Sequence, residues 1–172
     1  MIGWLVSLAT FPGTIVHEFA HKFFCDVSGV RVQKVCYFRF GNPAGYVLHQ
    51  KPNTVRQAFL ISVGPMIINS LLCMLISFLP MYTYMKTGEF SYYGVLMWLG
   101  TSIGMHAFPS NQDIASFVEH VRLERGRGFM LFSSKVLLVL VQIVNLLSFF
   151  WADLLYAIFI ASLLPLLALY FL

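Results

Sequence analysis

Long apolar stretches dominate the chain and alternate with short polar segments. A transmembrane helix needs about 20 mostly apolar residues to cross the hydrocarbon core of a bilayer. The stretches that approach or exceed this length are residues 2–21, 57–80, 92–108 and 136–171. The last is about twice the length of one span and is interrupted near 151–153, which favours two helices joined by a tight turn. The pattern therefore predicts a polytopic bundle of about five transmembrane helices.

Composition supports this interpretation. Hydrophobic residues make up 59% of the 172 residues and charged residues only 10%, whereas about a quarter of a typical soluble domain is charged. We expect an all-α membrane protein with a single domain over 1–172, comprising a core over 1–115 and C-terminal helices over 134–172. No cleavable signal peptide is evident at the N-terminus.

Basic residues are unevenly distributed among the segments that join these spans. The loop after the first span and the loop after the third span are rich in Lys and Arg, whereas the loop between the second and third spans holds only Lys86. Cytoplasmic loops are enriched in these residues, so we expect the two basic loops in the cytoplasm and the N-terminus outside. The net charge of +4 is then explained by topology and lipid headgroups, and no nucleic-acid partner is expected.

Both predicted cytoplasmic loops carry a recognisable local pattern. Residues 30–40 are β-branched and aromatic, and a Gly/Pro-containing turn at 41–45 separates them from Tyr-Val-Leu-His at 46–49. This order predicts a small β-hairpin. Residues 113–128 form an amphipathic stretch, which predicts a helix lying along the membrane surface.

The sequence His17-Glu18-Phe19-Ala20-His21 has the H-E-x-x-H pattern of zinc peptidases. On a helix, positions i and i+4 lie on one face, so two imidazoles can share one metal ion. The intervening glutamate can act as a general base toward water activated by the metal. Ionisable residues in a membrane helix are costly unless they are paired or functional. The motif therefore predicts a Zn²⁺ site with His17 and His21 as ligands and Glu18 as the catalytic residue.

The position of the motif along the first span suggests its depth. At about 1.5 Å per residue, His17 lies roughly 22 Å from the start of a straight helix, within a hydrocarbon core about 30 Å thick. The site is then expected slightly inside the cytoplasmic face. Pro12-Gly13 lies just upstream and favours a kink in this helix.

The third ligand must come from another part of the chain. A catalytic zinc usually has three protein ligands and one open position. Cys25 and Asp26 lie too far along the helix from the first histidine, about 12 Å in the case of Cys25. Asp113, at the cytoplasmic end of the third span, is the leading candidate, although it could instead cap a helix together with Ser110. His106 is the rival ligand, or a stabiliser of the oxyanion.

These motifs together resemble the site-2 protease family of intramembrane zinc metalloproteases. His-Glu-Phe-Ala-His matches the helix motif of that family, and residues 43–47 are similar to its G-G-Y-V hairpin element. Gly64-Pro65 followed by Asn69 resembles G-P-x-x-N, with the asparagine displaced by one residue. Residues 108–113 lie where the family carries N-x-x-P-x-x-x-L-D-G, with the flanking Leu and Gly absent.

The resemblance covers residues 12–115, and the chain leaves no room for the PDZ domain that many family members carry. It implies a zinc endopeptidase that cleaves membrane-protein substrates at or within the bilayer. The active site would lie toward the cytoplasmic side of a cell membrane, and the partners would be a substrate transmembrane segment and the lipid bilayer. Candidate substrate-binding residues are Asn111, Gly45, Tyr46 and Asn69. The hairpin either pairs with an extended substrate by strand addition or simply covers the site.

The alternative function is a non-proteolytic zinc-binding membrane protein, either a pseudoprotease scaffold or a small carrier. A membrane zinc protease of the type that trims prenylated proteins is disfavoured, because those enzymes use a glutamate ligand and no suitable glutamate lies at the right depth.

Overall fold

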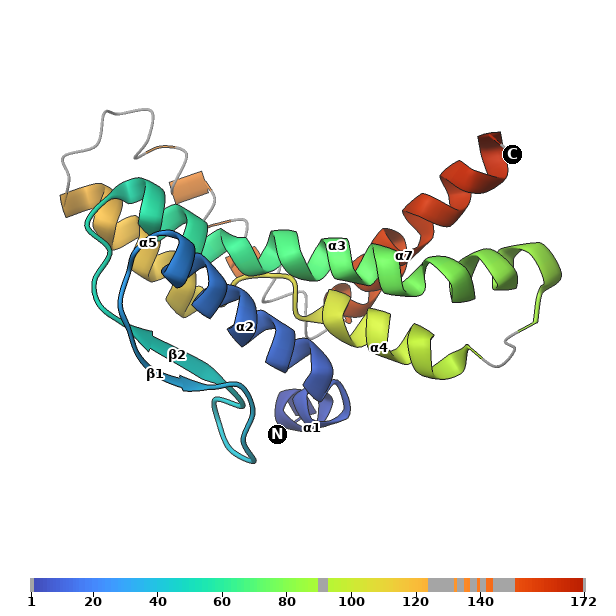
Figure 1. The fold of residues 1–172 in the computed structure, drawn as a ribbon, viewed down its shortest axis with the longest axis horizontal. Coiled ribbons are helices and arrows are strands. Elements are labelled where there is room, and N and C mark those ends of the chain that lie inside the picture. Colours follow the sequence, from blue (N-terminus) through green and yellow to red (C-terminus); the bar gives the residue numbers. More distant parts are fainter. Residues whose placement is uncertain are drawn as a thin grey trace.

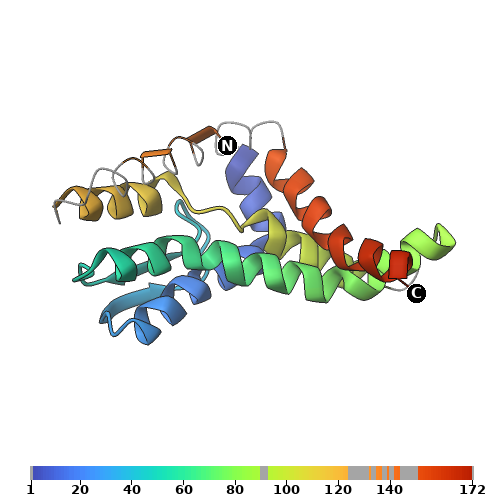
Figure 2. The ribbon, with the colours of Figure 1, turned by 90° about the horizontal axis from the view of Figure 1, so that it is seen from above.

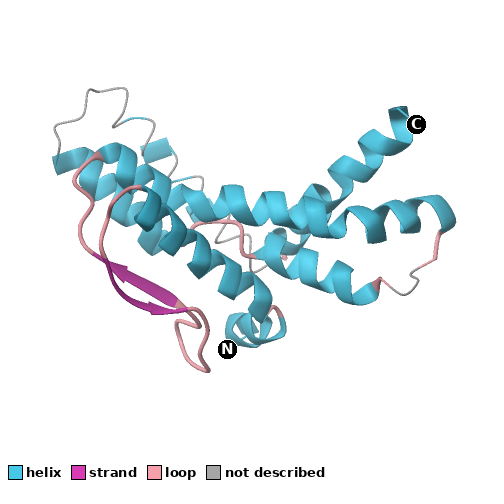
Figure 3. Cartoon of the chain, in the orientation of Figure 1, coloured by secondary structure: helices cyan, strands magenta, loops and turns pink. Residues whose placement is uncertain are grey.

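The computed structural model describes residues 2–89, 93–123 and 151–171, together with positions 132, 135, 136, 139, 142 and 143. This part of the chain is mostly helical, with one two-stranded antiparallel sheet (Figures 1 and 3). The elements are α1 (Ile2–Ala9), α2 (Phe11–Val27), β1 (Val32–Cys36), β2 (Tyr46–His49), α3 (Val55–Thr87), α4 (Gly94–Met105), α5 (Asn111–Leu123) and α7 (Ala152–Phe171). The helical fold and the hairpin agree with the hydrophobic pattern.

The number of membrane-spanning helices differs from the sequence prediction. Within the described ranges, two helices are long and apolar enough to cross a membrane, α3 and α7, rather than about five. Helix α4 is apolar but has only 12 residues, which gives it a length of about 18 Å, short of a hydrocarbon core of about 30 Å. Of the expected C-terminal pair, α7 is present, and the preceding helix falls largely outside the described residues.

The expected first span is divided into two helices. Helix α1 ends at Ala9 and α2 begins at Phe11, and the two lie at an angle to each other (Figure 2). Pro12 lies in the first turn of α2, where its missing N–H costs nothing, whereas inside one continuous helix it would remove a hydrogen bond and clash with the preceding turn. The expected kink is therefore a complete break, and the depth estimated for His17 along a straight helix no longer applies.

Helix α3 is the axis of the molecule. It has 33 residues, begins with a capping box formed by Thr54 and Gln57, and ends at Gly88 in the left-handed conformation. Helices α2, α4, α5 and α7 all contact it, and it extends along most of the length of the molecule (Figures 1 and 2). Elements that are distant in sequence therefore meet along a single helix.

Small residues allow the helices to approach closely. A Cβ atom on Gly104 of α4 would lie 2.7 Å from the Cys73 sulfur of α3 and 2.9 Å from the Ala157 Cβ of α7. A Cβ atom on Gly13 of α2 would lie 2.0 Å from the backbone oxygen of Ser102. Close backbone packing through small residues is characteristic of helices in membranes, where van der Waals contact contributes strongly to association.

The hairpin and α5 form the part of the fold that surrounds the motif. Strands β1 and β2 are antiparallel, with Cys36 opposite Tyr46, and both contact α2. The predicted amphipathic helix is present as α5, whose apolar residues Ile114, Phe117 and Val121 are buried where the helix packs on α3; its position along a membrane surface stays a prediction. This packing directs the start of α5 toward the motif. Residues 124–128 of the same amphipathic stretch lie outside the described residues.

Candidate metal centre

The two histidines of the motif lie one helical turn apart on α2 and face each other. Their ring centroids are 4.7 Å apart and the rings are nearly perpendicular, at 80°. The Nε2 atom of His17 lies 3.1 Å from the Nε2 atom of His21. The i, i+4 spacing therefore brings two ring nitrogens to one point, as the helical pattern predicted.

Backbone carbonyls set the tautomer of each ring. The His17 Nδ1–H group donates to the backbone oxygen of His106 at 2.7 Å, and the His21 Nδ1–H group donates to the backbone oxygen of Ile61 at 2.8 Å. A carbonyl oxygen can only accept, so each neutral ring carries its proton on Nδ1 and presents the Nε2 lone pair to the other ring. Two lone pairs that face each other at this distance favour a cation between them, and carbonyl support of this kind is typical of histidines that bind a metal.

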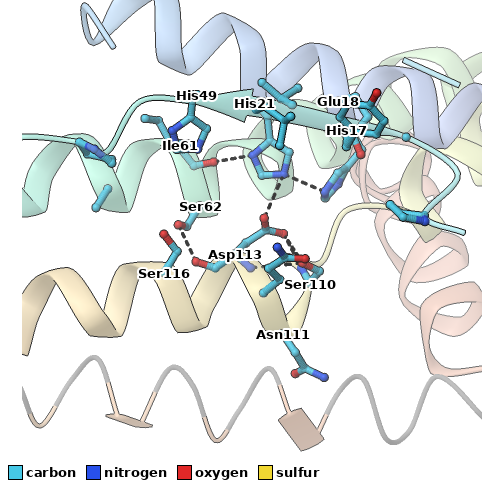
Figure 4. A pocket seen from close by; sticks show the side chains of 18 residues that line it. His17, Glu18, His21, His49, Ile61, Ser62, Ser110, Asn111, Asp113 and Ser116 are labelled. Carbon is cyan, nitrogen blue, oxygen red and sulfur yellow. Dashed lines mark hydrogen bonds and ion pairs between the residues drawn. The ribbon is translucent and has the colours of Figure 1, made fainter. Parts of the chain in front are cut away.

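Asp113 joins the two histidines from the first turn of α5. Its Oδ1 atom lies 3.6 Å from His21 Nε2, and the candidate ligand atoms of His17, His21 and Asp113 all lie within 4.8 Å of one another (Figure 4). A tetrahedral zinc with ligand bonds of about 2 Å separates its ligand atoms by about 3.3 Å. The three residues thus fit a zinc ion after an adjustment of up to about 1.5 Å at the third ligand.

The two carboxylate oxygens of Asp113 have different surroundings. Oδ2 accepts hydrogen bonds from the Ser110 backbone N–H at 2.8 Å and from the Ser110 hydroxyl at 2.6 Å, and Ser110 Oγ accepts from the Asp113 N–H at 3.2 Å. This is the capping box considered from sequence, and it leaves Oδ1 directed toward the histidines. One side chain is therefore placed to cap the helix and to bind a metal.

Electrostatics favour the ionised form of Asp113, which is the form that binds metals. Burial alone would favour the neutral acid, but the nearby His21 and His17 rings and the Ser110 hydrogen bonds hold the pKa of Asp113 well below its ordinary value. A carboxylate is thus present at neutral pH beside the two histidine rings.

Glu18 lies against the turn of the hairpin. A Cβ atom on Gly45 would lie 2.6 Å from Glu18 Cγ, 3.1 Å from Glu18 Cδ and 3.0 Å from the backbone oxygen of Tyr37. The absence of a side chain at Gly45 is therefore what allows the hairpin to pack against the glutamate. Glu18 remains partly accessible and lines the same pocket as His17 and His21.

A pocket of about 600 Å³ surrounds these residues. One wall is the hairpin, including residues 45–49, and the opposite side is formed by residues 110–113 at the start of α5. Ala58, Ile61 and Ser62 of α3 complete the lining. The pocket is therefore bounded by four elements that are distant in sequence, with the three candidate ligands and Glu18 exposed to it.

The rival ligand His106 does not join this group. Its Nδ1–H group donates to the backbone oxygen of Ser102 at 3.0 Å, and its ring packs where a Cβ atom on Gly13 would lie 2.5 Å from Nδ1. The contribution of His106 comes from its main chain, which accepts the hydrogen bond from His17. Of the two candidates for the third ligand, Asp113 is the one that the tertiary fold brings to the histidines.

The candidate substrate-binding residues occupy different environments. Tyr46 lines the pocket, and its ring is flanked by Lys34 Nζ at 5.7 Å and Arg39 Cζ at 5.1 Å from the centroid. Asn111 also contributes to the lining, although its side chain extends away from the histidines (Figure 4). Asn69 is completely buried and belongs to the packing between helices α3 and α4 rather than to the pocket wall.

Sequence reasoning did not identify His49, Ser62 or the carbonyl of Ile61 as parts of the site. His49 and Ser62 line the pocket, and the Ser62 hydroxyl donates to the backbone oxygen of Asp113 at 2.8 Å. These residues belong to no recognisable motif, and a backbone carbonyl leaves no signature in a sequence. Their roles arise entirely from the packing of α3 against α2 and α5.

Comparison of the chain with models of known protein families, with curated proteins and with solved structures yields no match.

Proposed function

We propose that this chain is an intramembrane zinc endopeptidase, related to the site-2 proteases, that cleaves membrane-protein substrates near the cytoplasmic face of the bilayer. The observation that carries the proposal is the convergence of ligand atoms from His17, His21 and Asp113 within 4.8 Å, in a pocket that Glu18 also lines. Two imidazoles and one carboxylate form a ligand set that suits catalytic zinc, with one coordination position left open.

The residues of the pocket have separable roles in peptide hydrolysis. A bound zinc ion would supply Lewis-acid activation of water and of the scissile carbonyl. Glu18 would accept the proton of the attacking water and return it to the leaving amine. His17, His21 and Asp113 would hold the ion, and the carbonyls of His106 and Ile61 would keep the two rings in the binding tautomer.

The hairpin offers a way to present an extended substrate to these residues. In the described sheet β2 pairs with β1 on one edge, and residues 46–49 of β2 line the pocket. An extended peptide could pair with β2 by strand addition, which would separate its peptide bonds from the helical hydrogen bonds that otherwise shield them. The alternative hypothesis, that the hairpin simply covers the site, predicts no backbone pairing with substrate.

The membrane setting is supported by the surfaces of α3 and α7. Both helices satisfy the length and hydropathy of a membrane span, and both expose large apolar side chains, including Leu75 at 65%, Leu155 at 65% and Phe159 at 59%. Apolar side chains exposed to this extent suit contact with lipid. The basic residues between α2 and α3 favour a cytoplasmic position for the hairpin.

The central experiment replaces Glu18 with Gln. Purified in detergent, Glu18→Gln should retain about one zinc ion per chain and lose cleavage of a transmembrane-segment substrate by roughly 10²–10⁴-fold, the usual contribution of a general base. Glu119→Gln is a matched control, because Glu119 is an exposed acid on α5 that pairs with Lys51 at 3.5 Å, and it should retain parental activity.

Two outcomes would contradict the proposal. Cleavage by Glu18→Gln at the parental rate would exclude the assigned mechanism. Stoichiometric zinc in a parent chain that cleaves none of a panel of transmembrane segments would favour the non-proteolytic zinc-binding alternative. Lack of zinc in the parent would exclude both the zinc endopeptidase and this alternative.

A further inference from the structure

Helix α3 contributes no ligand to the candidate metal centre, yet its residues form hydrogen bonds that help to position all three candidate ligands. Its Ile61 carbonyl accepts the His21 Nδ1–H group. One residue later, the Ser62 hydroxyl donates to the backbone oxygen of Asp113. Two turns further along, Asn69 donates to the backbone oxygen of His106, which is also the acceptor for His17.

Asn69 lies where α4 ends. Its Nδ2 group donates to the backbone oxygens of Ile103 at 3.2 Å and His106 at 3.0 Å, and the side chain is fully buried. Helix α4 ends at Met105, and the last carbonyls of a helix have no partner within the helix. Asn69 therefore acts as a C-terminal cap supplied by a neighbouring helix.

The carbonyl of His106 is shared between this cap and the metal centre. It accepts Asn69 Nδ2–H at 3.0 Å and His17 Nδ1–H at 2.7 Å. It lies at the C-cap position of α4, where the peptide is not held by helical hydrogen bonds on both sides. Without the Asn69 amide, the Ala107 N–H bond to the Gly104 oxygen at 3.1 Å would still hold this peptide on one side, but the carbonyl that orients the His17 ring would be less firmly fixed.

We propose that Asn69 is a positioning residue of the metal centre, which fixes the His106 carbonyl and through it the orientation of the His17 imidazole. The inference rests on the proposed zinc site. Groups that orient a metal-binding histidine typically contribute 10–100-fold to metal affinity. An effect of that size is expected at Asn69, although its side chain does not line the pocket.

The test measures zinc affinity of the full chain in detergent by competition with a chromophoric chelator. Asn69→Leu keeps the approximate size of the side chain and removes both donors, and it should bind zinc about 10–100-fold more weakly than the parent. Ser77→Ala is the matched control, because Ser77 is equally buried on α3 and packs against Gly100 of α4. It should keep the parental affinity.

A spectroscopic measurement separates positioning from general destabilisation. With Co²⁺ in place of Zn²⁺, the visible ligand-field bands of Asn69→Leu should shift or weaken relative to the parent, whereas those of Ser77→Ala should not. Asn69→Asp, which preserves the shape of the side chain, serves as the second variant if the leucine form does not fold, and the same loss of affinity is expected.

The outcomes distinguish this inference from the function on which it rests. If the parent binds zinc and the Asn69 variant that folds binds it with the same affinity and spectrum, the positioning role is excluded while the zinc site stands. If the parent binds no zinc, the proposed function and the positioning role both fail. An equal loss of affinity in Ser77→Ala would reduce the effect to packing and would also exclude the proposal.

Discussion

His17 and His21 each use one ring nitrogen for a backbone carbonyl and present the other to the pocket. The two carboxylate oxygens of Asp113 likewise have different partners. One accepts hydrogen bonds from Ser110, and the other is directed toward His21. At the residue scale, the candidate site is thus defined by individual atoms. Substitutions that remove one atom and keep another can separate structural roles from metal binding.

The two roles of Asp113 can be tested with a pair of variants. Asp113→Ala removes both the cap and the third ligand, so zinc affinity should fall by more than the 10–100-fold typical of supporting residues. Ser110→Ala removes only the capping partner and should cost about 1 kcal/mol of stability while the chain still binds one zinc ion. Chelator competition and thermal unfolding measure the two effects, and equal zinc affinities in both variants would argue against Asp113 as a ligand.

Gly45 provides a second test at this scale. In Gly45→Ala the new methyl group would meet Glu18 Cγ at 2.6 Å, so the glutamate must move, and a displacement of about 1 Å can cost on the order of 100-fold in rate. Zinc content should be unchanged, because the ligands are not affected. Gly41→Ala is the control from the same turn, since its nearest contact would be Arg39 Nε at 3.5 Å. Parental activity in Gly45→Ala would show that the position of Glu18 is not critical.

At the scale of elements, the contact of α4 with α3 and α7 depends on small residues. These helices share a buried cluster that includes Cys73, Met81 and Ile160, and Gly104 lies against it. The same contact positions the end of α4, whose His106 carbonyl supports His17. Helix packing far from the pocket is therefore connected to the geometry of the candidate ligands.

Gly104→Leu should destabilise the chain. Its Cβ atom alone would lie 2.7 Å from the Cys73 sulfur, and overpacking of this kind typically costs about 1–3 kcal/mol. We expect a lower unfolding midpoint, measured by thermal denaturation in detergent. Gly94→Leu introduces the same side chain on the same helix where nothing lies within 4 Å, and its midpoint should match that of the parent. Similar losses in both variants would rule out packing at Gly104 as the cause.

At the scale of the whole molecule, the orientation that we propose in a membrane follows from the charge distribution. Lys51 precedes α3 in the basic segment that contains the hairpin, and Glu89 follows the other end of the same helix. Helix α3 has 33 residues and thus a length of about 50 Å, more than a hydrocarbon core of about 30 Å. Its two ends are therefore expected on opposite sides of the bilayer.

Cysteine labelling can test this orientation. In a Cys36→Ser background, an impermeant thiol reagent should label Glu89→Cys in intact cells and should label Lys51→Cys only after permeabilisation. The two remaining cysteines, Cys25 and Cys73, are buried and should react slowly. Labelling of Lys51→Cys in intact cells would reverse the predicted topology and move the pocket to the outer side.

The sequence by itself determined the features that depend on nearby residues. The H-E-x-x-H spacing predicted that His17 and His21 would share a helical face, and the turn residues at 41–45 predicted the hairpin. Both predictions are confirmed, because helix periodicity and turn chemistry are local properties of the backbone. Within the part of the chain that the structure describes, the same local reasoning overestimated the number of spans, since apolar length alone did not reveal the break before Pro12 or the short α4.

Only the tertiary structure decided which distant groups meet at the motif. From sequence, Asp113 and His106 both remained candidates, and packing of α5 on α3 brings the Asp113 carboxylate to His21 while His106 supplies a carbonyl. The approach of Gly45 to Glu18 and the capping of α4 by Asn69 likewise depend on contacts between elements far apart in the chain. Such contacts arise from the complementary shapes of packed helices, which the order of residues along any one helix does not specify.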